Sequence, residues 1–143
     1  MTERECRLFI YGTLRRGEPK HGLLEGAELL GETTTVPAFY LVDLGPHAAL
    51  VRGGTTAVCG ELYRVTLEMR RRIDVDRQVP ITFSRELIEL AGGTSADAYL
   101  ISGDRVRGRR RLAHGDWKKR FAPSAHPRPG GAWVAWSRGR WTK

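Results

Sequence analysis

From residue 7 to residue 102 the chain is a series of short β-type runs that are separated by turns rich in glycine and proline,. We count six or seven of these runs, and only the stretch that follows Thr66 has the pattern of an α-helix,. Thr66 is suited to the N-cap position, and the segment 74–80 ends the helix,. No strand–helix–strand rhythm repeats. We therefore predict an α+β fold, a small mixed β-barrel packed with one or two helices.

Two glycine-rich turns predict hairpins within this fold. RGGTT at 52–56 lies between two β-type runs, and so does GGTS at 92–95, so each turn is expected to join the runs beside it,. Gly60 in the middle of a run indicates a bulge or a close approach by another part of the backbone. The strand acids Glu61 and Glu86 are expected on outward faces.

The positive charge is concentrated at the C-terminal end of the chain. Residues 1–104 hold 12 Lys or Arg and 15 Asp or Glu, whereas residues 105–143 hold 12 Lys or Arg and one acid. All four tryptophans lie in this second segment, and we expect Trp117 in the core. We predict a barrel domain at 1–121 and a basic, tryptophan-containing C-terminal extension at 122–143, which begins like a linker.

Neither membrane insertion nor metal binding is indicated. The first eight residues, MTERECRL, are charged, and no later run approaches the roughly 18 apolar residues of a membrane span,. Cys6 and Cys59 lie in apolar runs, which favours reduced core residues, and no Cys or His cluster has metal-ligand spacing,. We expect a cytoplasmic protein.

Five short motifs occur in a fixed order along the chain: FIYGTLRRG, VDLGP, GELYRV, an ID pair at a helix end followed by P…F.R, and GDW. With these motifs, over about residues 6–121, the sequence resembles the γ-glutamylcyclotransferase-like family. It is most similar to the small bacterial branch and to the γ-glutamylamine cyclotransferases. The resemblance implies a mixed β-barrel packed with helices, which agrees with the strand pattern.

The loop Tyr11, Gly12, Thr13 and Leu14 is the first candidate site. A loop that leaves a strand in this way can turn several backbone N–H groups to one side and bind an anion, and glycine lets a ligand approach the backbone. The resemblance implies that these four residues hold the glutamyl part of a substrate. The alternative from the local pattern is an ordinary strand end in which the Thr13 hydroxyl caps its own backbone.

The resemblance also implies a reaction. In the family, the α-amine of a γ-glutamyl group attacks its own side-chain carbonyl, closes the 5-oxoproline ring and expels an amine. This step needs a base and donors for the oxyanion, and no cofactor. The family's base is a glutamate three residues after an LD pair and three before a proline. Here Ile73–Asp74 and Pro80 align with these markers, and the glutamate position is Arg77. An arginine stays protonated and cannot accept the proton.

Three interpretations of this catalytic turn stay open. Asp76 replaces the glutamate as a shorter base; Arg77 reaches into the pocket and pairs with an anionic ligand group; or Arg77 extends into solvent and the cavity is passive. Asp74 is expected to make a helix-end contact instead. The predicted catalytic candidates are therefore Asp76 and Arg77.

The predicted function is cyclotransferase or related acyl chemistry on a γ-glutamyl or similar carboxylate-bearing small molecule, with release of an amine. The substitution at Arg77 predicts slow or absent turnover of simple γ-glutamylamines. Two alternatives have no catalysis: a ligand-binding relative, or a basic module that docks through residues 105–143 on nucleic acid or on an acidic protein.

Overall fold

The computed structural model describes residues 5–121 of the 143-residue chain. These residues form one sheet of eight strands and one α-helix. The extension predicted at 122–143, with its three outer tryptophans, lies outside the described residues. The elements in chain order are β1 (Glu5–Ile10), η1 (His21–Leu24), β2 (Glu28–Thr34), β3 (Phe39–Asp43), β4 (Ala48–Arg52), β5 (Cys59–Thr66), α1 (Leu67–Asp76), β6 (Ser84–Glu89), η2 (Ala91–Gly93), β7 (Ser95–Leu100), η3 (Gly103–Val106), β8 (Arg110–Arg111) and η4 (Trp117–Lys119), where η marks a 3-10 helix.

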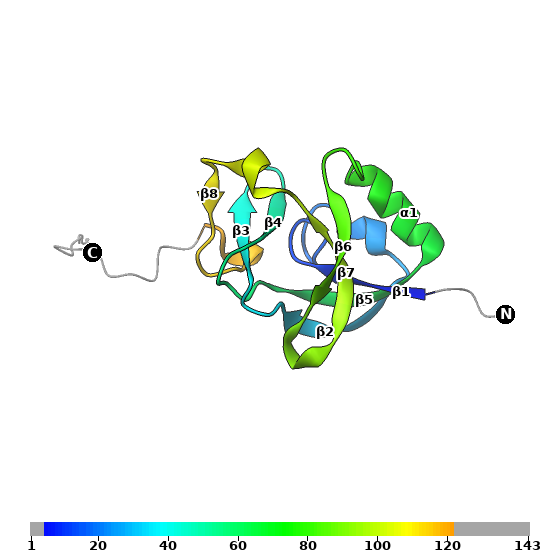
Figure 1. Cartoon of the computed structure of the whole chain (residues 1–143). Helices are drawn as coiled ribbons and strands as arrows, with labels where there is room; N and C mark the ends of the chain where they lie inside the picture. The colour runs from blue at the N-terminus through cyan, green and yellow to red at the C-terminus, as the bar shows by residue number, and fades with distance from the viewer. Residues whose placement is uncertain (1–4, 122–143) are drawn as a thin grey trace, which may run out of the picture.

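The sheet is mixed and curls into a barrel (Figure 1). Its strand order is β2-β5-β1-β7-β4-β3-β8, and β6 pairs with β7. Strand β7 runs parallel to β1 and β4, whereas the other pairs are antiparallel. A bridge between Thr35 and Leu90 joins the ends of β2 and β6 and closes the ring. The predicted α+β fold with a small mixed barrel is therefore confirmed.

The hairpin predicted at 52–56 is wrong, whereas the one predicted at 92–95 is formed by β6 and β7. Strand β4 pairs with β3 and β7, and β5 pairs with β1 and β2. The physical reason is a contact across the turn. Gly54 lies so close to β3 that a Cβ there would be 2.3 Å from the carbonyl oxygen of Phe39. The chain therefore pairs briefly with the start of β3, in a bridge between Thr56 and Phe39, instead of folding back along β4.

Strand β1 is buried on both faces and carries the loop of interest at its C-terminal end. Leu8 and Ile10 face the core under α1, and Phe9 faces the second core inside the barrel with Trp117, which is 1% exposed. Close backbone approach occurs where Gly60 was expected to allow it, because a Cβ there would be 2.3 Å from the carbonyl oxygen of Ile10. The strand end is thus held rigidly from all sides.

Helix α1 begins and ends as its sequence predicts, and its end points to the loop. The Thr66 hydroxyl oxygen accepts a hydrogen bond from the N–H of Met69 at 3.1 Å. Met69 and Ile73 are buried against the barrel. The last residue is Asp76, and Arg77 follows as the C-cap, with its N–H donating to the carbonyl of Ile73. The helix end therefore fixes the backbone positions of Asp76 and Arg77, the two catalytic candidates.

Among residues 5–121, no helix is long and apolar enough to cross a membrane. Cys6 and Cys59 are free thiols, as predicted, but both are half-buried rather than core residues, and Cys6 packs against the edge of the core.

Candidate active site

The loop after β1 is anchored by its first side chain. The hydroxyl of Tyr11 donates a hydrogen bond to the carbonyl of Tyr99 at 2.6 Å and accepts one from the N–H of Leu50 at 3.3 Å. Burial raises the pKa of Tyr11 to about 12. Tyr11 therefore stays uncharged and links the end of β1 to β7 and β4. Its hydroxyl is fully hydrogen-bonded, as a donor to β7 and an acceptor from β4.

Three backbone N–H groups of this loop have no protein partner. Within the part of the chain that the structure describes, the N–H groups of Gly12, Thr13 and Leu14 donate to no protein acceptor. Gly12 also lies close to β4, because a Cβ on it would be 3.0 Å from the Cβ of Ala48. Unpaired donors that are partly enclosed are costly unless water or a ligand accepts from them.

These residues line a narrow pocket whose cavity volume is about 10 Å³, room for about one water molecule, within about 270 Å³ of empty space that includes its open mouth,. Residues 9–14 form one wall, and Ala48, Arg77 and Tyr99 complete it. Arg77 is the charged member of this lining, and its residue is 7% exposed. The structure therefore places Arg77 beside the four predicted loop residues and away from solvent.

The guanidinium of Arg77 makes two hydrogen bonds. It donates from Nη2 to Oγ1 of Thr13 at 2.8 Å and from Nη1 to Nδ1 of His47 at 3.3 Å. It also lies 5.8 Å from the ring centroid of Phe83, a cation–π distance,. A guanidinium has five N–H donors, and neither hydrogen-bond acceptor carries a negative charge. The buried cation is thus only partly compensated.

Asp76 lies beside Arg77 but does not line the pocket. Its Oδ1 accepts from Nζ of Lys20 at 2.8 Å. Its Oδ2 is buried without a hydrogen bond and lies 3.7 Å from Nε of Arg77. The guanidinium therefore stands between this carboxylate and the pocket wall at Thr13.

His47 is the neighbour of Arg77 that the sequence did not single out. It ends the turn between β3 and β4, and its carbonyl accepts from the N–H of Leu44 at 2.9 Å. Burial and the positive charges of Arg77 and Lys20 hold its pKa below the ordinary value of 6.5, against a smaller opposite effect of Asp76. Its position directly before Ala48, in a glycine- and proline-containing turn, is the only sequence signal for its place.

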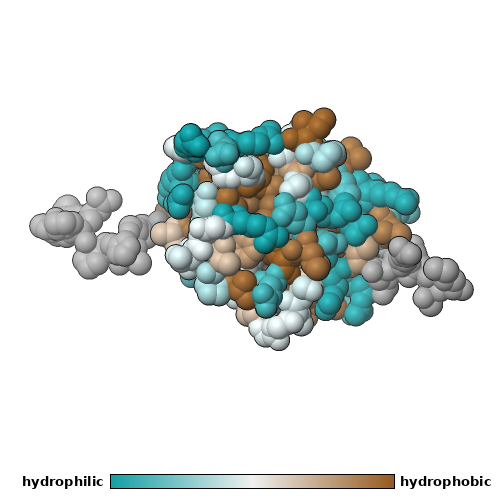
Figure 2. Space-filling view, in the orientation of Figure 1, coloured by the Kyte–Doolittle hydropathy of each residue, from teal (hydrophilic) through white to brown (hydrophobic). Residues whose placement is uncertain are grey.

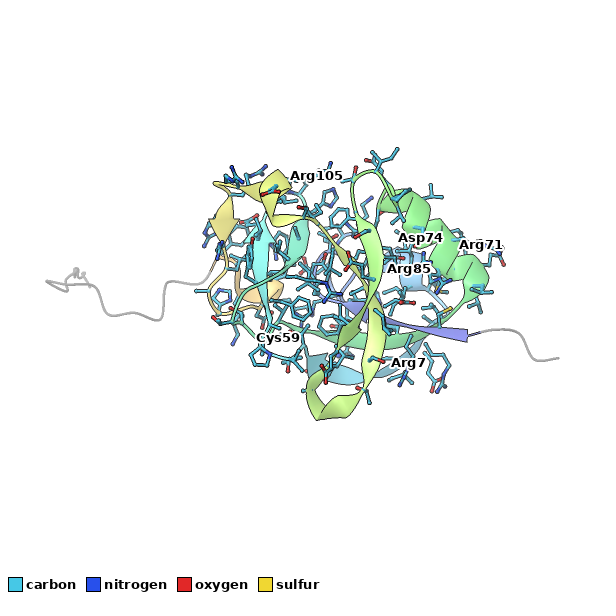
Figure 3. All side chains as sticks on the ribbon, viewed as in Figure 1. Arg7, Cys59, Arg71, Asp74, Arg85 and Arg105 are labelled. Carbon is cyan, nitrogen blue, oxygen red and sulfur yellow. The ribbon has the colours of Figure 1, made fainter. Side chains whose placement is uncertain are left out.

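Asp74 makes the helix-end contact that the sequence predicts. It accepts a hydrogen bond from the hydroxyl of Tyr99 at 2.6 Å and pairs with Arg85. Figure 3 shows Asp74 on α1 facing Arg85 on β6. The helix end is thereby joined to the two strands beside the pocket.

A second buried arginine holds the other end of the loop. Arg15 is 6% exposed and pairs with Glu61 at 3.5 Å and with Asp116 at 2.7 Å. Glu61 is fully buried and also accepts from the N–H of Arg16 at 3.0 Å and from the hydroxyl of Tyr63 at 2.9 Å. The expectation that Glu61 faces outward is wrong, because these donors draw it inside.

The contacts of Arg15 unite three of the sequence motifs. Arg15 belongs to FIYGTLRRG, Glu61 to GELYRV and Asp116 to GDW. Glu86, by contrast, is half-exposed and pairs with Arg52, as expected for an outward face. The motifs thus include the loop after β1 and also the buried ion pairs that hold it in place.

Hydrophilic side chains gather over η3 and β8, at the upper left of Figure 2. Arg107, Arg109, Arg110 and Arg111 are exposed there, and Arg107 and Arg110 pair with acids. Docking of nucleic acid or an acidic protein through residues 105–143 stays a prediction. No group of three or more His, Cys, Asp or Glu suited to a metal ion occurs in residues 5–121.

Comparison with known proteins identifies the class. The family model described as "Gamma-glutamyl cyclotransferase, AIG2-like" matches residues 8–119. The chain therefore belongs to the γ-glutamylcyclotransferase-like family.

Two curated relatives and one solved structure illustrate this membership. The chain is 40% identical over 88 residues to a putative γ-glutamylcyclotransferase of Vibrio cholerae, covering 62% of this chain and 76% of that protein. It is 32% identical over 94 residues to the γ-glutamylaminecyclotransferase of Mus musculus, covering 59% of this chain and 63% of that protein. The crystal structure of c4763 from uropathogenic E. coli superposes with a TM-score of 0.73 over 87% of this chain and 99% of that one, at 24% identity, and supports the fold alone.

Proposed function

We propose that the protein binds a small acyl compound that carries a carboxylate, and that it performs cyclotransferase-type chemistry on this compound with release of an amine. One observation carries the proposal: the buried guanidinium of Arg77 is hydrogen-bonded to Thr13 in the wall of a pocket that also exposes three unpaired backbone N–H groups. The two donor sets favour two different oxygens of one ligand.

The guanidinium suits the carboxylate, because its planar fork matches two carboxylate oxygens and the pairing compensates a buried charge. The loop N–H groups suit the acyl oxygen, where negative charge develops when a nucleophile attacks. For a γ-glutamyl compound, Arg77 would hold the α-carboxylate. The α-amine would then attack the γ-carbonyl, close the five-membered ring and release the amine.

Binding of a matched ligand pair tests the recognition step. γ-Glutamyl ethylamide and 4-aminobutanoyl ethylamide share the amine and the acyl group, and only the first has the carboxylate. By titration calorimetry, we expect the wild type to bind the first at least about tenfold more tightly, which corresponds to about 1.4 kcal/mol. Arg77→Gln, which keeps polarity but removes the charge, should abolish this preference.

Arg71→Gln is the matched control, because Arg71 is an exposed arginine on α1 that points away from the barrel (Figure 3). It removes one positive charge without touching the pocket, so the preference should persist. A wild type that binds neither compound, or an Arg77→Gln variant that keeps the full preference, would contradict the proposal.

A further inference from the structure

Two side chains beside Arg77 could accept a proton: Asp76, whose Oδ2 is buried without a hydrogen bond, and His47 through Nδ1. Neither lines the pocket, but His47 directly precedes Ala48, which does. Because a guanidinium can only donate, Nδ1 of His47 must accept its hydrogen bond, so the imidazole carries its proton on Nε2 and is neutral,. The distance of 3.3 Å is long for an N–H hydrogen bond,. The contact is therefore weak, and a ligand carboxylate can replace it at the guanidinium.

The other titratable groups near the pocket are less suited to accept a proton. Asp76 is held by Lys20 at 2.8 Å and lies behind Arg77. Tyr11 and Tyr99 use their hydroxyls in buried hydrogen bonds. Glu61 accepts three hydrogen bonds and forms an ion pair with Lys118. The charged groups that act on His47 are Arg77, Lys20 and Asp76.

We propose that His47 is the general acid–base residue of this active site, so that the proton-accepting group comes from the turn before β4 instead of from the end of α1. This inference rests on the function proposed above. When the ligand carboxylate accepts a hydrogen bond from Nη1 of Arg77, it replaces Nδ1 of His47 as the acceptor. The lone pair of Nδ1 is then free and lies beside the ligand carboxylate. In an α-amino acid the amine and the carboxylate share one carbon, so the amine then lies next to this nitrogen.

The step balances with His47 alone. The ligand's ammonium first gives one proton to Nδ1, because it has no lone pair; the amine nitrogen then bonds to the carbonyl carbon, and the carbonyl electron pair moves to the oxygen, which the loop N–H groups stabilise. The imidazolium gives its proton to the departing nitrogen, and Nδ1 takes the second surplus proton from the attacking nitrogen. The oxygen then re-forms its double bond, the bond to the departing amine breaks, and that amine takes the remaining proton from the imidazolium. An imidazolium beside Arg77 gives up its proton readily, because the neighbouring cation opposes its charge.

The closing experiment separates proton transfer from binding. His47→Gln keeps an acceptor for Arg77 but has no group that titrates. We expect it to bind γ-glutamyl ethylamide within about threefold of the wild type, whereas 5-oxoproline release falls by about 10² or more, the usual contribution of acid–base catalysis. In the wild type, kcat should fall in acid with a midpoint below 6.5, and this limb should be missing in His47→Gln.

His114→Gln is the control, because His114 is exposed and lies outside the pocket, and it should leave both measurements unchanged. A His47→Gln variant that keeps its rate would overturn the inference while the proposed function stands. A wild type that binds the compound but releases no 5-oxoproline at any pH would end the inference and the catalytic part of the proposed function, and would leave only the binding part. A wild type that does not bind the compound would end both proposals. Weak binding by His47→Gln, with a rate per bound complex that is unchanged, would reduce His47 to a positioning residue for Arg77.

Discussion

Two buried arginines hold the two ends of the same loop, and they differ in what compensates their charge. Arg15 is 6% exposed and Arg77 is 7% exposed. Arg15 forms ion pairs with Glu61 and Asp116, whereas Arg77 hydrogen-bonds to a hydroxyl and an imidazole and has a carboxylate only at 3.7 Å. Burial is the same, but Arg15 has a carboxylate oxygen at 2.7 Å, whereas the carboxylate nearest to Arg77 lies at 3.7 Å and accepts no hydrogen bond from it.

The difference separates a structural cation from a ligand-binding one. A buried charge that is fully paired within the fold has little to gain from a ligand, whereas a partly compensated one gains a full charge-assisted bond from an incoming anion. We therefore expect substitution of Arg15 to change mainly the free energy of unfolding, and substitution of Arg77 to change mainly ligand binding and reactivity.

The largest effect is expected for Arg15→Met. Removal of this cation leaves Glu61, which is fully buried, without its closest positive partner, and loss of one member of a buried ion pair typically costs about 3–5 kcal/mol. Urea unfolding measures the change. Arg77→Met is the matched variant and should cost less than about 1.5 kcal/mol, because its two hydrogen-bond acceptors are neutral and the carboxylate that it leaves, Asp76, keeps its ion pair with Lys20 at 2.8 Å,. Equal losses in the two variants would refute the distinction.

The sequence predicts the parts of this arrangement that depend on local patterns. The Thr66 cap, the β6–β7 hairpin and the loop after β1 follow from neighbouring residues. The burial of Glu61 does not, because its partner Arg15 is 46 positions away and their strand-like surroundings suggest an outward face. His47 was missed for the same reason, since its contact with Arg77 spans 30 positions and joins two turns.

The next effect in size concerns activity. Arg77→Glu restores a carboxylate at the family's base position, and we expect kcat for 5-oxoproline release from γ-glutamylamines to rise about tenfold to a hundredfold above that of the wild type, within the range of general-base catalysis, whereas KM rises because the cation that binds the ligand carboxylate is lost. Chromatographic assay of 5-oxoproline measures it. The control is Arg77→Gln, which removes the cation without supplying a base and should show no such rise.

The same variant sharpens the assignment of the proton acceptor. In the Arg77→Glu variant, the additional change His47→Gln should lower 5-oxoproline release only slightly. In the wild-type background the same change should remove most of the 5-oxoproline release. Such non-additivity is the signature of two groups that serve one step. Equal losses in both backgrounds would show that His47 acts independently of the residue at 77.

A smaller effect is expected for Thr13→Val, which removes the hydroxyl that accepts from Arg77 at 2.8 Å. The shape is nearly conserved, so the loss should come from the unpaired guanidinium donor and amount to about 1–2 kcal/mol in unfolding free energy. Thr13→Ser keeps the hydroxyl and should lose much less. If the two variants are equally destabilised, the hydrogen bond to Arg77 contributes nothing measurable.

The smallest effect is the loss of unfolding free energy in acid. The pH range of this loss distinguishes the two arginines, because Arg15 acts on Glu61 and Arg77 acts on His47. Burial raises the pKa of Glu61, but the hydrogen bonds from Arg16 and Tyr63 and the charge of Arg15 outweigh it, so the pKa lies below the ordinary 4.5. Since the folded state binds this proton less tightly than the unfolded state, the contribution to stability is present above pH 4.5 and is lost as the pH falls through the folded pKa. Arg15→Met removes one cause of the lowered pKa of Glu61, so the free energy of unfolding should fall less steeply with pH below 4.5.

The corresponding window for Arg77 lies higher. Burial, and then the charge of Arg77, lower the pKa of His47 below 6.5, so the unfolded state binds the proton more tightly and stability falls as the pH drops from 6.5 through the folded pKa,. Arg77→Met removes one cause of the shift but not burial, so it should reduce this loss without abolishing it. Urea unfolding at pH 7.5, about 5.5 and about 3.5 resolves both windows. Arg77→Met could instead change only the loss of stability below pH 4.5, which is assigned to Glu61. In that case Arg77 would not be the cation that acts on His47, and the contrast between the two arginines would be refuted.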